Sequence, residues 1–160
     1  MSRFSPQAED ILRRAGWYPG RQVPDLVALW RKSVSESDGV DMFPGAEKAL
    51  LEFGGLKLDE QGPGVTCSRE PFNLDPTLAM YEHDRFEDFI SALNTNLYPL
   101  GEAVGGSCFI AIAENGNVYL LMQELMLIGQ SMEEGLESLL IGRLGERIDV
   151  PKSAGAARQA

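Results

Sequence analysis

Histidine and cysteine, on which many catalytic and metal sites depend, are scarce in this sequence. Its 160 residues include one histidine and two cysteines. There is no Cys-x-x-Cys pair, no histidine pair and no Asp-x-Asp-x-Asp-Gly loop, which excludes the common zinc and EF-hand patterns. We therefore expect neither a bound metal nor a cofactor.

Long hydrophobic runs are also missing. No window approaches the ~20 apolar residues of a membrane-spanning helix, and residues 1–6 contain no apolar core of signal-peptide length. We expect a cytoplasmic protein without membrane contact. Cys67 and Cys108 lie far apart among strand-like residues. In a reducing cytoplasm they are predicted to be buried free thiols, with a disulfide as the alternative.

No group of residues indicates a catalytic site. His83, the only histidine, precedes a predicted helix without a nucleophile or an orienting partner, so a surface or capping role is expected. Gly105-Gly106-Ser107-Cys108 leads into a strand, whereas a nucleophile elbow leads into a helix, and we predict a turn or bulge there. Nothing singles out a pair of carboxylates. We expect a binding protein rather than an enzyme; a small hydrolase would need a polar cluster that is not apparent.

The charge of the chain is strongly acidic and unevenly distributed. The formal net charge is −10, and residues 33–90 contain thirteen acidic and four basic residues. A surface of this charge repels nucleic acid and anionic membranes and attracts basic partners. The alternative is a solubilising surface without a partner.

Capping residues and apolar spacing predict five helices. They begin at Ser5-Pro6, Pro24, Pro44, Asp84 and Ser131, and the first four end near Gly16, Ser33, Gly54 and Thr95. The second is expected to bury Leu26, Leu29 and Trp30 and to be followed by a polar loop over residues 33–40. The fourth, with Asp84 as its cap, carries an apolar stripe of Phe86, Phe89, Ile90 and Leu93. The last directs Met132, Leu136, Leu139 and Leu140 inward.

Strands are predicted between these helices. They cover residues 56–58, 65–67, 98–103, 108–113 and 117–122, whereas residues 72–80 are expected to be irregular or extended. Pro99 points to an edge, a strand start or a bulge. Asn115-Gly116 predicts a hairpin with both turn residues at positive φ. The element order indicates an α+β fold. We expect one domain over residues 1–150 and a disordered tail over 151–160.

Two surfaces are candidates for contact with a partner. Gly16-Trp17-Tyr18-Pro19-Gly20-Arg21 is predicted to be a fixed turn, because two glycines and a proline occur within six residues. Trp17 should be partly buried over the end of the first helix, Tyr18 should remain more exposed, and Arg21 should stack on a ring or pair with an acid. The second surface consists of Glu82, Asp84, Glu87 and Asp88 at the start of the fourth helix. Its alternative is a solvated face that favours the helix N-terminus.

Several motifs resemble those of a known family. The segment from Ile11 to Arg21 is similar to the N-terminal signature of SUKH-family immunity proteins, in the subgroup marked by a Gly-Trp-x-Pro-Gly-Arg turn. The resemblance covers about residues 4–142, and its further motifs are Leu51–Leu56, Leu97–Ala103, Gly116–Leu120 and Ile128–Ser131. Gly135 departs from expectation, since a helix position favours alanine by about 1 kcal/mol.

The resemblance implies a fold and a function. The fold would be α+β of the Smi1/Knr4 type, a mixed and mainly antiparallel sheet packed by N-terminal helices, an inserted helix and a C-terminal helix. The function would be that of a bacterial immunity protein that binds and neutralises a polymorphic toxin, often a nuclease or deaminase and therefore basic. The alternative is a SUKH-type regulatory or adaptor module that binds a host protein. The oligomeric state stays open.

Overall fold

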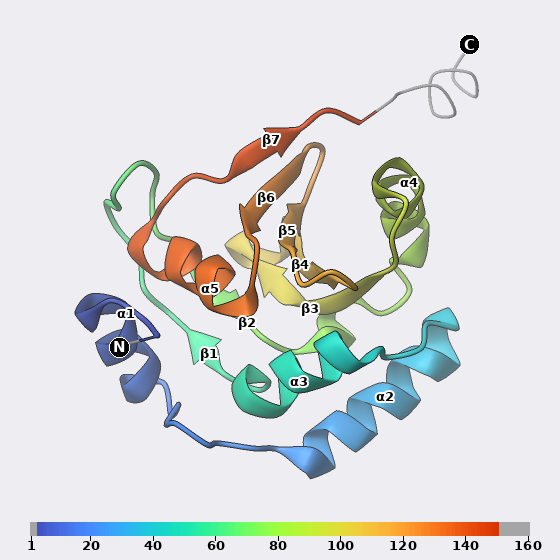
Figure 1. Cartoon of the computed structure of the whole chain (residues 1–160), viewed down its shortest axis with the longest axis horizontal. Coiled ribbons are helices and arrows are strands. Elements are labelled where there is room, and N and C mark those ends of the chain that lie inside the picture. The colour runs from blue at the N-terminus through green and yellow to red at the C-terminus, as the bar shows by residue number, and fades with distance from the viewer. Residues whose placement is uncertain (1–2, 151–160) are drawn as a thin grey trace.

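Five α-helices and seven strands make up residues 3–150, the part of the chain that the computed structural model describes (Figure 1). The predicted tail over 151–160 lies outside the described residues. The α-helices are α1 Pro6–Arg14, α2 Pro24–Asp38, α3 Pro44–Phe53, α4 His83–Leu93 and α5 Met132–Ile141. The strands are β1 Lys57–Leu58, β2 Phe72–Asn73, β3 Leu97–Ala103, β4 Cys108–Ala113, β5 Val118–Leu121, β6 Leu125–Gly129 and β7 Glu146–Ile148. Two 3₁₀ turns are η1 Pro76–Ala79 and η2 Val104–Gly106. The predicted α+β fold is confirmed.

The strands form one antiparallel sheet in which each strand pairs with the next along the chain. All six residues of β4 are buried, as their apolar run predicts. Pro99 lies where the register between β3 and β4 shifts, so the bulge is the correct interpretation of that proline.

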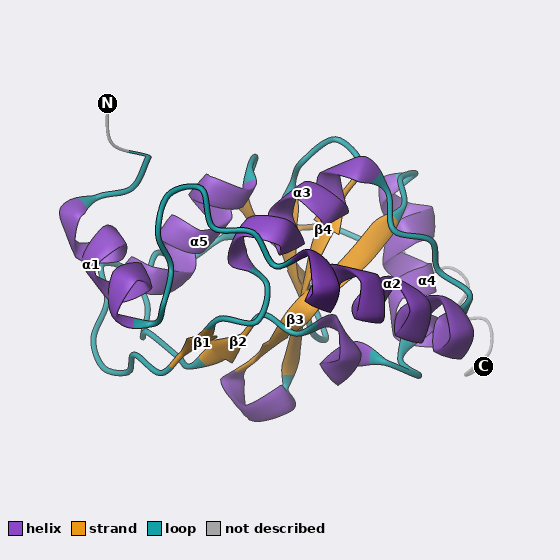
Figure 2. Cartoon of the chain, turned by 90° about the horizontal axis from the view of Figure 1, so that it is seen from below, coloured by secondary structure: helices purple, strands orange, loops and turns teal. Residues whose placement is uncertain are grey.

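The two faces of the sheet pack against different helices (Figures 1 and 2). One face joins α1, α2, α3 and α5 in the larger core, to which the sheet contributes Tyr98, Leu100, Ile110, Ile112, Val118 and Ile128. On the opposite face, α4 packs against a smaller cluster that includes Leu97, Phe109, Tyr119 and Leu125. Because successive side chains of a strand point to opposite faces of the sheet, each of β3, β4, β5 and β6 contributes residues to both clusters.

Three residues were predicted to cap helix starts through their side chains, and two of them do so. The Ser5 and Ser131 hydroxyls accept from the backbone N–H of Ala8 and Glu134, respectively. Asp84 is not a cap: α4 begins at His83 after Glu82, because the backbone turns at Tyr81, and Asp84 lies in the first helical turn.

The second helix differs from its prediction in length and in orientation. It continues through the predicted polar loop to Asp38 and ends at Gly39, whose φ is +68°. Its buried residues are Val27, Trp30 and Val34. Leu26 and Leu29 were expected inside but lie on the exposed flank. Val34 extends the stripe that Val27 and Trp30 begin, so burial continues through residues whose polarity suggests a loop.

The strand predictions need three corrections. Residues 65–67 form bends, and their N–H groups donate to the carbonyls of Ile141 and Gly142 at the end of α5. The expected irregular segment over 72–80 contains β2 and the 3₁₀ turn η1. β6 and β7 have no counterpart among the predicted strands, and β7 follows α5, which was expected to be the last element. The apolar run of β6 was a usable signal, whereas β7 has none.

The predicted hairpin joins β4 and β5. Only Gly116 has a positive φ, +98°, so the expectation of a second positive φ at Asn115 is wrong. Ala113 donates from its backbone N–H to the carbonyl of Asn117, so residues 114–116 form a three-residue loop in which one glycine closes the turn. Cys67 is half-buried and Cys108 is buried, and both are free thiols. Residues 104–106 form the turn η2, as expected for this glycine-rich segment.

The unexpected glycine in α5 has a packing reason. A Cβ atom on Gly135 would lie 3.0 Å from the Cβ and a γ-methyl of Val118, and one on Gly129 would lie 2.3 Å from the backbone nitrogen of Gly135. The helix therefore lies directly on β5 and β6. The lower helix propensity of glycine relative to alanine is the cost of this close approach.

Candidate functional site

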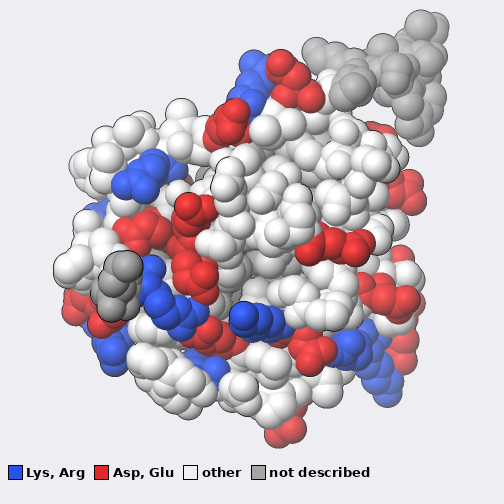
Figure 3. Space-filling view, viewed as in Figure 1, with Lys and Arg blue, Asp and Glu red and all other residues white. Residues whose placement is uncertain are grey.

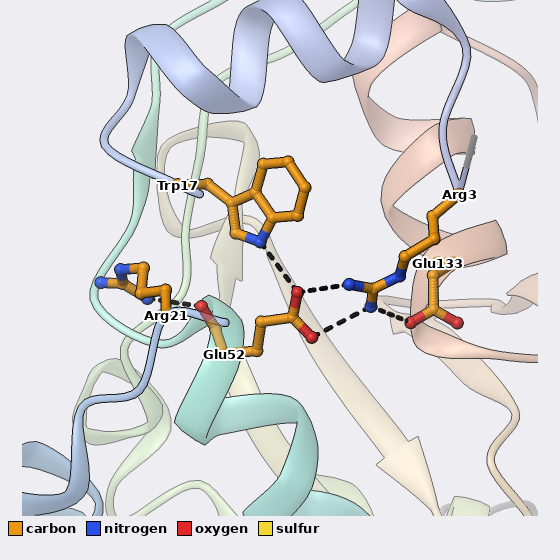
Figure 4. A network of polar contacts seen from close by, with 5 residues as sticks. All are labelled: Arg3, Trp17, Arg21, Glu52 and Glu133. Atoms are coloured by element: carbon orange, nitrogen blue, oxygen red, sulfur yellow. Dashed lines mark hydrogen bonds and ion pairs between the residues drawn. The ribbon is translucent and has the colours of Figure 1, made fainter. Parts of the chain in front are cut away.

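The Gly16–Arg21 turn belongs to a polar network that joins three helices (Figure 4). Trp17 donates from Nε1 to a carboxylate oxygen of Glu52 at 3.0 Å. Arg3 donates to Glu52 at 2.6 Å and to Glu133 at 2.7 Å. Since Glu52 belongs to α3 and Glu133 to α5, the network fastens both helices to the segments that flank α1.

Trp17 is buried in this turn. Its side chain is 3% exposed, its ring stacks on Phe53 at a centroid distance of 6.2 Å, and Phe4 meets it edge-on at 5.6 Å. The predicted burial of Trp17 is confirmed and is more complete than expected. Tyr18 is 54% exposed, as expected for its neighbour in the turn.

Within residues 3–150, Arg21 neither stacks on a ring nor forms an ion pair with a carboxylate, contrary to both expectations. Its guanidinium donates to the backbone carbonyls of Glu52 at 2.6 Å and Gly54 at 2.8 Å. Burial lowers the pKa of Arg21. The C-terminal carbonyls of a helix lack partners within the helix, so Arg21 caps α3. The turn is therefore a structural joint.

Glu52 is the centre of the joint, and its charge stabilises the fold. Burial alone would raise the pKa of Glu52, but hydrogen bonds from Arg3 and Trp17 outweigh it and hold the pKa below 4.5. A carboxylate with a lowered pKa contributes stability above its unfolded pKa, and this stability is lost as pH falls through the folded value.

We expect Glu52→Gln to lower the free energy of unfolding at pH 7 by about 1–2 kcal/mol, because the amide keeps an acceptor for Trp17 but loses the charge that binds Arg3. The difference from wild type should shrink as pH falls below 4.5. Denaturant titrations across pH measure both. Glu9→Gln, which breaks an exposed pair with Arg13, is the control and should cost only tenths of a kcal/mol. A difference independent of pH would contradict the role of the charge.

The second predicted surface lies on the other side of the molecule, at the start of α4. Asp84, Glu87 and Asp88 are exposed and Glu82 is half-buried. Glu82 pairs with Arg85 at 3.8 Å, and Glu87 lies 3.6 Å from His83. His83 therefore has a surface position at the helix start.

The end of α2 adds a further carboxylate beside α4. Asp38 accepts a hydrogen bond from the backbone N–H of Tyr81 at 2.8 Å. We call Asp38, Glu82, Asp84, Glu87 and Asp88 the acidic face. Figure 3 shows acidic side chains along the edge of the molecule that carries α4 and the end of α2.

Tyr81 lies within the acidic face and was missed by sequence analysis. It is 79% exposed, the most exposed of the large hydrophobic side chains described, and its φ is +70°. A bulky residue in the left-handed region carries strain of about 1–3 kcal/mol, so the backbone is held in this turn by its surroundings. The signal in the sequence was an aromatic residue directly before an acidic stretch.

Tyr18 does not join the acidic face. It follows α1, which lies across the molecule from α4 in Figures 1 and 2. The structure thus brings together four of the five predicted contact residues, adds Asp38 and Tyr81, and leaves Tyr18 at a separate place.

The described residues contain neither a candidate membrane-spanning helix nor a candidate metal site. None of the helices in residues 3–150 combines the length and apolar character of a membrane span. Within the same residues, no three His, Cys, Asp or Glu side chains are grouped to hold a metal ion.

A comparison with protein families matches residues 4–142 to the SUKH-3 immunity protein family. The match covers most of the chain. The chain belongs to the SUKH-3 immunity protein family. Searches of curated proteins and of solved structures returned no match. A role in toxin immunity follows from membership, and with it a cognate toxin as partner. The motifs that carried the resemblance to SUKH proteins lie within the matched residues, while the subgroup defined by the Gly-Trp-x-Pro-Gly-Arg turn stays a prediction.

Proposed function

We propose that this SUKH-3 protein neutralises its toxin by binding the toxin domain directly, with the acidic face as the contact surface. The observation that carries the proposal is the position of Tyr81, an exposed aromatic side chain within five carboxylates. The toxin would be a basic nuclease or deaminase domain in the cytoplasm, since enzymes that act on polyanions carry basic surfaces. Neutralisation would need binding alone, without catalysis.

The chemistry of the acidic face suits such a partner. Carboxylates accept bidentate hydrogen bonds from arginine, and a concentrated negative charge speeds the encounter with a basic protein. Tyrosine is enriched among the residues that dominate binding energy, because it buries a large area at low entropic cost. Arg85 offsets only one carboxylate of the face, since it pairs with Glu82 at 3.8 Å and its guanidinium lies 5.4 Å from the centroid of the Phe109 ring.

The test is the affinity for the cognate toxin domain. We expect Glu87→Lys/Asp88→Lys to weaken binding by at least about tenfold, mainly through a slower association rate, and Tyr81→Ala to weaken it through faster dissociation. Added salt should slow association of the wild-type protein. The control is Asp10→Lys/Asp59→Lys, which changes net charge equally on the α1 side of the molecule.

Two outcomes would contradict the proposal. If the variants of the acidic face bind like wild type, that face is a solubilising surface and the contact lies elsewhere, with Tyr18 as the next predicted contact. If the toxin domain does not bind at all while a host protein does, the regulatory or adaptor alternative replaces neutralisation.

A further inference from the structure

A small apolar pocket opens where α5 ends and leaves part of the sheet uncovered. Its volume is about 110 Å³, and its apolar lining includes Val104, Leu120, Met122, Met126, Leu139 and Leu144. An apolar cavity of ~150 Å³ accepts benzene, so this pocket has room for one aliphatic side chain.

Exposed apolar side chains surround the pocket. Leu144 is 62% exposed, and Val104 and Met122 are exposed at its rim. Val65 is 63% exposed, and its backbone N–H donates to the carbonyl of Ile141 at the end of α5. The rim is held in place, since Leu144 donates from its backbone N–H to the Thr66 hydroxyl at 2.8 Å. Exposed apolar side chains grouped around a pocket indicate a surface that a binding partner covers.

We propose that a second copy of this chain covers the pocket in a two-fold symmetric dimer. The surface is complementary to itself in shape, because Leu144 stands exposed in the wall of a pocket that has room for one aliphatic side chain. It is also complementary in charge: Glu70 and Arg143 both line the pocket, and neither side chain has an ion-pair partner within residues 3–150. A two-fold axis brings each feature of one copy onto its complement in the other.

The dimer has a salt dependence that distinguishes it from toxin binding. Two chains of net charge −10 repel each other, so added salt should strengthen self-association through screening. Association with a basic toxin should slow under the same conditions. The proposal does not rest on the toxin and can fail without it.

Sedimentation equilibrium of the full chain tests the proposal. We expect a monomer–dimer equilibrium that Leu144→Asp weakens by about 30-fold, the loss expected for a central apolar anchor. Leu29→Asp, at a 56% exposed leucine on α2, is the matched control and should dimerise like wild type. Thermal unfolding verifies that each variant is folded.

Charge reversal provides the sharper test. Glu70→Arg and Arg143→Glu should each weaken the dimer, and the double variant should restore it, because the symmetric pairing is then rebuilt with opposite signs. A monomer at all concentrations, or a dimer insensitive to Leu144→Asp, would overturn the proposal. So would a monomer whose pocket variants lose toxin binding, since the toxin would then be the occupant.

Discussion

Replacing Trp17 with alanine is expected to lower the free energy of unfolding by about 3–5 kcal/mol, the usual cost of removing a buried aromatic side chain. The indole is 3% exposed between Phe4 and Phe53 and supplies a hydrogen bond to Glu52. Its removal leaves a cavity and takes away one of the two donors to Glu52 Oε2, which still accepts a hydrogen bond from Arg3. Denaturant titration of the purified variant measures the loss, which is a large part of the 5–15 kcal/mol typical of a domain.

Tyr18→Ala is the matched control, because Tyr18 is the adjacent aromatic residue and is 54% exposed. It should cost less than about 1 kcal/mol. If Trp17→Ala instead kept full stability and abolished binding of the toxin, Trp17 would be an interface anchor rather than part of the structural joint.

Replacing Gly101 with alanine is expected to destabilise the sheet by at least about 2 kcal/mol. A Cβ atom on Gly101 would lie 1.9 Å from the carbonyl oxygen of Asn73 and 3.0 Å from the backbone nitrogen of Asp75. These atoms belong to the backbone, so no side-chain rotation relieves the clash, and β2 would have to move away from β3. Denaturant titration and amide exchange in β2 measure the effect.

Gly45→Ala is the control for this change. Gly45 lies in the first turn of α3, where a Cβ atom would meet only the Phe43 ring at 3.8 Å. Alanine also favours helix over glycine, so this variant should be as stable as wild type or slightly more stable. Equal stability of both alanine variants would show that β2 adapts more easily than the backbone spacing suggests.

Most of the carboxylates of the acidic face could be predicted from local sequence, but the complete set of residues in the face could not. Asp84, Glu87 and Asp88 follow one another along α4, and the stripe of Phe86 places them outward. Asp38 joins them only because α2 runs five residues beyond its predicted end at Ser33. Tyr81 lacked any signal for a positive φ, since glycine and asparagine are the residues that usually adopt it.

The sequence by itself determined the features that depend on neighbouring residues. These are the serine caps of α1 and α5, the buried run of β4, the hairpin at Gly116 and the order of elements that defines an α+β fold. Each is decided within a few positions, because caps, turns and alternation are local properties of the backbone.

Only the tertiary structure decided how distant segments meet. Arg21 caps α3, Glu52 gathers Arg3 and Trp17, and Gly101 allows β2 to approach β3. These contacts join residues that are about 30 or more positions apart, and no local pattern specifies which partner a charged or small residue will meet. The physical reason is that burial and hydrogen bonding are satisfied by whichever groups the packed helices and sheet bring together.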